Sequence, residues 1–151
     1  MTKKVYTAEQ EGYQFEEILR GLGITLNNNY FRVEKGFRPF LHRIFSRSRI
    51  YRGNITQSYF LAFTENQLVM MYRDHPRGSI NDNIVKIDFD DIDNFSVTKG
   101  IIYYCLQFEH ENESFYFYID ADGSFQITEH NYSNENFHVL KAKNFNGLLR
   151  N

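Results

Sequence analysis

The chain has 151 residues and a formal net charge of −2, which is the size of one domain with room for a substantial core. No apolar run reaches the roughly 18 residues of a membrane span, and no basic and then apolar leader precedes Thr7. The single cysteine, Cys105, cannot form an internal disulfide, which favours a reducing compartment. We therefore expect one cytoplasmic domain over residues 1–151. The abundance of Asn and Ile with only two Pro is typical of an AT-rich bacterial or phage genome.

Charge is segregated along the chain. From Arg32 to Arg52, seven basic residues against one acidic residue give +6. From Asp82 to Asp122, two lysines against ten carboxylates give −8. Such segregation predicts a dipolar surface that steers a charged partner, unless both runs are merely solvated loops and strand edges.

The first predicted element is a helix over about residues 8–22. Thr7 and Gln10 have the spacing of a capping box, and the apolar residues after them follow a helical period. After this helix we expect a strand at residues 24–26, an asparagine turn and a strand at residues 30–34. Residues 37–45 have the apolar spacing of a short basic amphipathic helix, either exposed or packed on the sheet.

Short strands dominate from Ile55 to Ile119. Tight polar turns separate segments in which apolar and polar residues alternate. The apolar residues then return to a helical period, which predicts a helix over residues 134–149 capped by Ser133 or Asn134. The pattern predicts an α+β fold in which a bent antiparallel sheet or partly open barrel is capped by a C-terminal helix, with an extra N-terminal helix.

The order of these segments resembles the bacterial pleckstrin-homology-like (PH-like) domains. Residues 59–63, 64–66 and 67–72 are similar to their first hairpin, and residues 87–92 followed by 95–102 are similar to the next part of the pattern. The resemblance implies a PH-like core over residues 30–151 whose last helix plugs one end of the barrel. Residues 1–23 are then a helical extension.

The resemblance also implies a binding platform in place of an enzyme, most simply an adaptor that binds a protein. PH-like domains bind peptides along a strand edge or beside the last helix, so we expect outward tyrosines to contact the partner: Tyr103, Tyr116 and Tyr118. In the competing interpretation, these tyrosines pack under the N-terminal helix. Self-association through an uncovered edge strand is a variant of the same reading.

The alternative is binding of an anionic membrane or a phosphate head group through residues 35–52. Lys35 followed by Arg47-Ser48-Arg49 is similar to the phosphoinositide-binding layout of eukaryotic PH domains. The candidate ligand-binding residues are Lys35, Arg38, Arg43, Arg47, Arg49 and Arg52. Aromatic residues interleave with these bases, but the acidic overall balance argues against nucleic acid as the main partner.

Catalytic and metal-binding patterns are weak. The five histidines lack metal-ligand spacing, no Ser-His-Asp order comes with a glycine elbow, and Cys105 has apolar strand neighbours. The acidic residues between Asp88 and Asp93 serve as turn formers as well as they would serve a hard cation. A partial EF-hand spacing that begins at Asp120 lacks its first carboxylate. We therefore expect no enzyme, no cofactor and no metal site.

Overall fold

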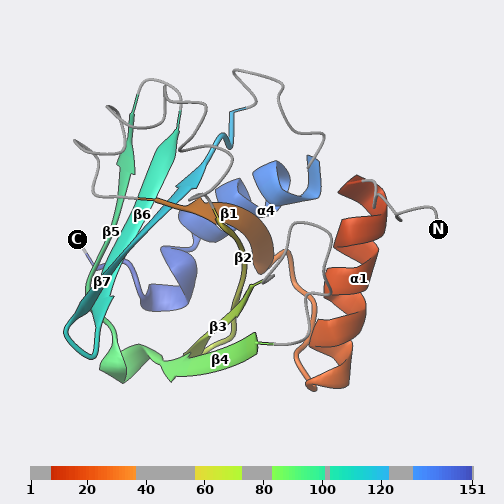
Figure 1. The fold of residues 1–151 in the computed structure, drawn as a ribbon, viewed down its shortest axis with the longest axis horizontal. Helices are drawn as coiled ribbons and strands as arrows, with labels where there is room; N and C mark the ends of the chain where they lie inside the picture. Colours follow the sequence, from red (N-terminus) through yellow and green to blue (C-terminus); the bar gives the residue numbers. More distant parts are fainter. Residues whose placement is uncertain (1–7, 37–56, 73–82, 101–102, 123–130, 151) are drawn as a thin grey trace.

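The computed structural model describes residues 8–36, 57–72, 83–100, 103–122 and 131–150, which form an α+β fold around an antiparallel sheet (Figure 1). The helices of this part of the chain are α1 (Ala8–Gly21), α4 (Asn131–Ala142) and the 3-10 helices η2 (Phe89–Asp91) and η3 (Phe145–Gly147). The strands are β1 (Tyr30–Lys35), β2 (Gln57–Phe63), β3 (Gln67–Tyr72), β4 (Asn83–Asp88), β5 (Asp93–Lys99), β6 (Tyr104–His110) and β7 (Glu113–Ile119).

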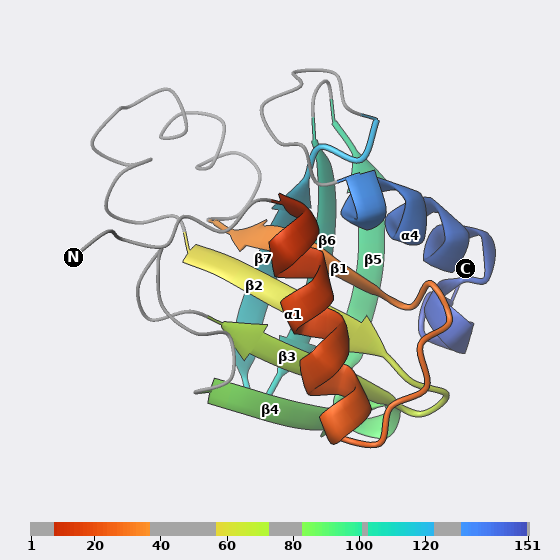
Figure 2. The same cartoon turned by 90° about the vertical axis from the view of Figure 1, so that its right-hand side faces the viewer.

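The seven strands are ordered β4-β3-β2-β1-β7-β6-β5, and every pairing is antiparallel. β1 pairs with β2 along all six of its residues but with β7 only at Glu34 and Lys35. The two halves of the sheet therefore meet at one end of β1 and cross each other steeply (Figure 2). This arrangement agrees with the predicted bent sheet and is consistent with a partly open barrel.

The main core fills the inner face of the sheet. Alternate residues of each strand point inward, and α4 and η3 add Phe137, Leu140 and Phe145, which are at most 1% exposed. Phe31 lies edge-on to Phe137, with 5.5 Å between ring centroids, and stacks on Phe63 at 5.8 Å. The C-terminal helical segments therefore cover the inner face of the sheet, in agreement with the predicted capping by a C-terminal helix.

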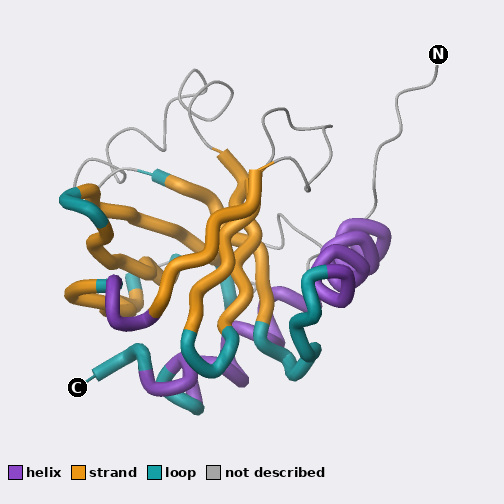
Figure 3. The backbone as a smooth tube through the Cα atoms, turned by 90° about the horizontal axis from the view of Figure 1, so that it is seen from below, coloured by secondary structure: helices purple, strands orange, loops and turns teal. Residues whose placement is uncertain are grey.

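A second apolar cluster lies on the outer face, under α1. Phe15 and Leu19 of this helix are fully buried against β1, β2 and β3, where Phe60 and Met71 are also fully buried. In Figure 2 α1 crosses β2 and β3, and Figure 3 shows the helix outside the sheet. α1 thus confirms the predicted N-terminal helix.

Two predicted elements differ from the structure. Residues 24–26 do not form a strand, because Asn29 binds the local backbone: its Nδ2 donates to Thr25 O at 3.2 Å and to Phe63 O at 3.0 Å. Ile24 and Leu26 pack against the cluster under α1 instead.

The last helix is shorter than predicted and begins earlier. α4 ends at Ala142, and residues 144–147 all have left-handed backbone angles, which Asn and Gly tolerate best. Neither predicted cap is used as one, because α4 already begins at Asn131 and Ser133 Oγ accepts a hydrogen bond from Arg32 N. The apolar residues of the predicted stripe still reach the core, through two helical segments in place of one. Among the described residues, no helix combines the length and apolar character needed to cross a membrane.

Candidate functional site

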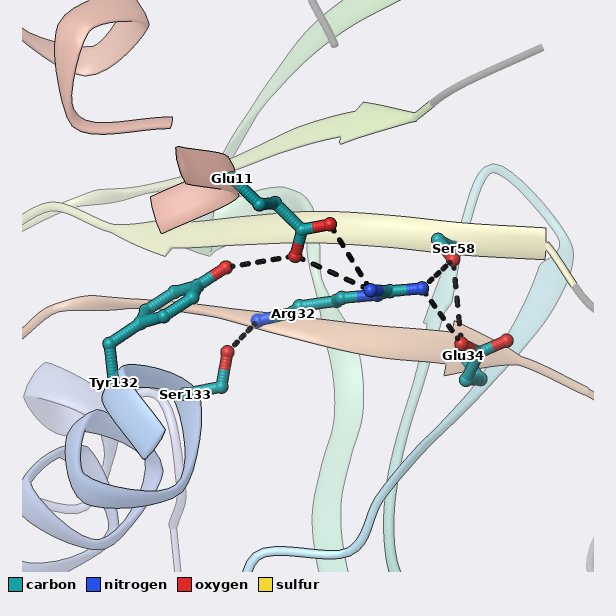
Figure 4. A network of polar contacts seen from close by, with 6 residues as sticks. All are labelled: Glu11, Arg32, Glu34, Ser58, Tyr132 and Ser133. Atoms are coloured by element: carbon teal, nitrogen blue, oxygen red, sulfur yellow. Dashed lines mark hydrogen bonds and ion pairs between the residues drawn. The ribbon is translucent and has the colours of Figure 1, made fainter. Parts of the chain in front are cut away.

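A partly buried polar network joins α1, β1, β2 and α4 (Figure 4). Glu11 accepts hydrogen bonds from Arg32 Nη1 at 3.1 and 3.4 Å, and from the Tyr132 hydroxyl at 3.3 Å. On its other side Arg32 Nη2 donates to Ser58 Oγ at 2.7 Å and lies 3.4 Å from Glu34 Oε1. One guanidinium therefore ties the helix to the outer face of two strands.

Two features hold this network in place. Gly12 permits the close approach of α1 to α4, because a Cβ at this position would lie 3.1 Å from Cδ1 of the Tyr132 ring. The Glu11 side chain is only 4% exposed, and its ion pair with Arg32 at 3.1 Å offsets part of the cost of burying a carboxylate. Burial and the Glu11 charge raise the pKa of Tyr132 well above its ordinary value, which keeps this hydroxyl a hydrogen-bond donor.

The contacts of this network link secondary-structure elements to one another. Tyr132 stays neutral, and Ser58 lies beside the Arg32 guanidinium and the Glu34 carboxylate. Among the described residues, no histidine contacts Ser58 to act as its base. Burial raises the pKa of Glu34, although Arg32 and Ser58 lower it, but its side chain is 42% exposed at the end of the network. The arrangement positions α1 against β1, β2 and α4.

A second polar cluster surrounds the Tyr104 ring near the end of β5. Lys99 Nζ and Lys141 Nζ lie 5.7 and 5.3 Å from the ring centroid, and Asp122 pairs with Lys99 at 3.4 Å and with His138 at 3.1 Å. Burial alone would raise the pKa of Asp122, but Lys99, His138 and Tyr104 together lower it. The carboxylate stays ionised and neutralises part of the local positive charge.

Of the six predicted ligand-binding residues, only Lys35 lies in the described part of the chain. Its Nζ lies 5.2 Å from the Phe115 ring centroid, 5.7 Å from that of Tyr59 and 3.8 Å from Glu113 Oε1. Lys35 is thus engaged by β2 and β7. The other five lie outside the described residues, as does the predicted amphipathic segment 37–45: Arg38, Arg43, Arg47, Arg49 and Arg52.

The three predicted contact tyrosines share the outer face of β6 and β7. Tyr103 and Tyr116 are half-buried, whereas Tyr118 is 6% exposed and lies opposite Cys105 and Glu34. Tyr103 contacts Tyr118 edge-on at 6.5 Å. The apolar cluster under α1 is built from other residues, so these tyrosines are not part of it. Only Tyr103 and Tyr116 retain accessible surface for a partner.

The structure describes part of the candidate metal-binding segments, and it describes Cys105. Within the described ranges, no group of three or more His, Cys, Asp or Glu side chains is placed to hold a metal ion. The partial EF-hand spacing runs past Asp122 into residues outside those ranges. Cys105 is buried as predicted, and burial raises the pKa of its thiol.

The described sheet has two edge strands, β5 and β4, and they differ in regularity and in exposed side chains. β5 is the edge strand of one half, and it is interrupted: its pairing with β6 shifts register between Asp93 and Ser96. In this bulge Asn94 has a φ of 54°, and its Nδ2 donates to Glu109 Oε2 at 2.9 Å. The exposed side chains of β5 are all polar: Asp93, Asn94, Thr98 and Lys99.

β4, the edge strand of the other half, is regular and partly apolar. All six of its residues pair with β3 without a register shift. Ile84 on the outer face is 36% exposed and Val85 on the inner face 43% exposed, and they are adjacent in the chain. The β4 edge therefore offers aliphatic surface on both faces of the sheet.

Half of the backbone groups of β4 point away from β3 and meet no other described strand. Phe89 N donates to Asn66 O at 2.8 Å, so Phe89 faces β3. Alternation along an antiparallel strand then directs the N–H and C=O groups of Ile87 and Val85 toward β3, and those of Ile84, Lys86 and Asp88 away from it. Among the described strands β4 has β3 as its only neighbour. These outward groups are a template for another strand.

Sequence analysis missed both the network and the β4 edge, although each leaves a signal. Glu11 lies four residues before Phe15 and thus on the apolar face of α1, where a charge calls for a buried partner. Ile84 and Val85 are consecutive aliphatic residues, which breaks the alternation of a strand with one buried face.

Comparison with known proteins gives little for this chain. A scan against protein-family models finds no match, and a search of curated proteins finds none either. A similar solved structure is the C-terminal domain of an unknown protein from Leishmania infantum, which is 12% identical and has a TM-score of 0.45. The alignment covers 88% of this chain and 95% of that domain. At this level the likeness carries no argument about function.

Proposed function

We propose that the chain is a non-catalytic, PH-like protein-binding domain that accepts an extended segment of a partner along the β4 edge. The observation that carries this proposal is the regular β4 edge, with outward backbone groups at Ile84 and Lys86 and exposed aliphatic side chains on both faces. An added strand gains affinity from main-chain hydrogen bonds, and side-chain contacts on the two faces give it specificity.

The PH-like part of the proposal has separate support. Two antiparallel meanders meet at β1 and β7, and the C-terminal helical segments pack in the core. This arrangement is compatible with the strand meander and C-terminal helix that the sequence resemblance implies. Such a fold sets a prior for binding, while the site itself must carry the function.

Affinity capture with matched variants tests the proposal. Ile84→Lys places a charge on the outer face of the β4 edge, and Thr98→Lys places the same charge on the β5 edge, where the exposed side chains are already polar. From a lysate of the cells that make the protein, we expect a protein that the wild type and Thr98→Lys retain and Ile84→Lys loses. Equal capture by all three would show that the partner binds elsewhere.

Peripheral binding to an anionic membrane through residues 35–52 stays a second proposal, which no described contact favours. Lys35 is engaged by Phe115, Tyr59 and Glu113, and the arginines lie outside the described residues. Sedimentation with phosphatidylglycerol vesicles tests it: binding must weaken steeply with salt and fall when Arg43, Arg47 and Arg49 become Ala. No binding at low salt would remove it.

A further inference from the structure

We infer that the strand accepted by β4 is β4 of a second copy of this chain, so that one sheet continues through a two-fold symmetric dimer. This inference rests on the proposed function, since it names the partner of the same edge. It follows from how the side chains of β4 distribute over the two faces and from the charge that each register brings together.

Symmetry first limits the registers. In a continuous antiparallel sheet, side chains of opposed residues point to the same face. A two-fold axis perpendicular to the sheet must therefore pass midway between one residue and the same residue of the second copy. In β4 the outer face carries Ile84, Lys86 and Asp88, of which Ile84 and Lys86 lie opposite Met71 and Val69 in the cluster under α1. The inner face carries Val85 and Ile87.

Overlap and charge then select one register. Because β4 spans Asn83–Asp88, five residues of each copy overlap only when the axis lies between the two Val85 residues or between the two Lys86 residues. An axis at Lys86 opposes two ammonium groups across the interface, which is destabilising. An axis at Val85 opposes no like charges and places Val85 against its own copy.

The same register covers the other exposed aliphatic side chain. Ile84 comes to lie opposite the partner's Lys86, whose four-carbon stem packs on it while the ammonium group stays in water. Ile84 and Lys86 both point their backbone groups outward, so each of the two Ile84–Lys86 pairs exchanges two hydrogen bonds across the interface. The surface that is accessible on one copy is complementary to itself.

The expected dimer is weak. Stable interfaces bury about 1,200–2,000 Å², and pairing five residues of one strand covers much less. Sedimentation velocity therefore needs a range from about 10 µM to about 1 mM, over which mass action shifts the equilibrium. We expect the weight-average mass to rise from the 18.1 kDa of one chain toward twice that value.

Charge variants at Ile84 test the register. Since Ile84 lies opposite the partner's Lys86, Ile84→Lys creates two like-charge pairs and keeps the protein monomeric over the whole range. Ile84→Glu creates two opposite-charge pairs and preserves or strengthens the dimer. Thr98→Lys on β5 leaves association unchanged. Self-association that is insensitive to both Ile84 variants would overturn the inference.

A cysteine variant tests the axis directly. Val85 faces its own copy in a non-hydrogen-bonded pair, where the two Cα atoms lie about 4.5 Å apart, within the range that a disulfide spans. Val85→Cys should form a covalent dimer under mild oxidation, while the buried Cys105 does not compete. A monomer at every concentration that also fails to cross-link would refute the dimer. A different protein, captured by the wild type and lost in Ile84→Lys, would still support the proposed function.

Discussion

The two edge strands of the sheet, β5 and β4, differ in how they are protected against pairing with another strand. β5 has a bulge at Asn94 and exposes polar side chains, and its two apolar residues, Phe95 and Val97, pack on the core. β4 is straight and regular, and it exposes Ile84 and Val85. The comparison shows that protection of an edge depends on register and side-chain direction more than on apolar content, since both strands contain aliphatic or aromatic residues.

The largest expected difference between the edges is in stability. Phe95 is 8% exposed, and its ring centroid lies 5.4 Å from that of Phe145, so Phe95→Ala should cost about 3–5 kcal/mol of unfolding free energy. Val85→Ala should cost less than about 1 kcal/mol, because the Val85 side chain is largely outside the core. Urea denaturation measures both values. Equal costs would mean that β4 is as deeply packed as β5.

The Arg32 network should have the next largest effect, because it holds α1 over the three strands beside β4. Arg32→Met removes the guanidinium that pairs with the buried Glu11 carboxylate at 3.1 Å, which should cost about 3 kcal/mol. Adding Glu11→Gln to Arg32→Met should restore part of this loss, as chemical denaturation of the double variant measures. If the second substitution makes the protein still less stable, the ion pair is not the reason that Arg32 matters.

A proline on β4 separates pairing from folding. The Lys86 N–H points away from β3, so Lys86→Pro removes a donor to the added strand while the β3–β4 ladder stays intact. We expect a stability loss of at most about 1 kcal/mol together with loss of dimer and partner binding. The variant Ile87→Pro removes a ladder donor and also a buried side chain, so it should cost about 2–5 kcal/mol. Similar losses in the two variants would show that our assignment of outward groups is wrong.

The smallest effect concerns Glu34, at the seam between the halves of the sheet. Burial raises the pKa of Glu34, so the folded state favours the protonated carboxyl group. This preference stabilises the fold fully below the ordinary glutamate pKa, and the stabilisation is lost as pH rises through the pKa of the folded state. Glu34→Gln should therefore match the wild type near pH 3 and be slightly more stable at pH 7. The gain is below about 1 kcal/mol because the side chain is 42% exposed. Thermal melts at both pH values measure it, and a variant that is less stable at pH 7 would contradict the assignment.

Much of the fold follows from local patterns in the sequence. Alternation located the strands from β2 to β7, and the helical period located α1 and the apolar residues of α4 and η3. The break at residues 144–147 was missed because the apolar spacing continues across it, while the backbone there is left-handed. A strand was wrongly predicted at residues 24–26, where asparagine side chains bind the backbone.

The candidate site depends on information that local patterns do not hold. An edge strand is defined by its neighbours, and β1 lies between β2 and β7, whose contacts at Glu34 and Tyr118 join residues far apart in the sequence. Alternation indicates which side chains share a face but leaves the order of strands open. The Glu11–Arg32 pair likewise becomes visible only when α1 lies across β1.

Amide hydrogen exchange, followed residue by residue by NMR in dilute protein and in the bound state, tests the β4 edge most directly. In dilute protein, the amides of Ile84 and Lys86 should exchange quickly, and those of Val85 and Ile87 slowly. With a second copy or a captured partner bound, exchange at Ile84 and Lys86 should slow by about tenfold or more, which corresponds to about 1.4 kcal/mol of protection. The outward amides of β5, at Val97 and Lys99, should not change. Slowing at Val97 and Lys99 with none at Ile84 and Lys86 would contradict the account.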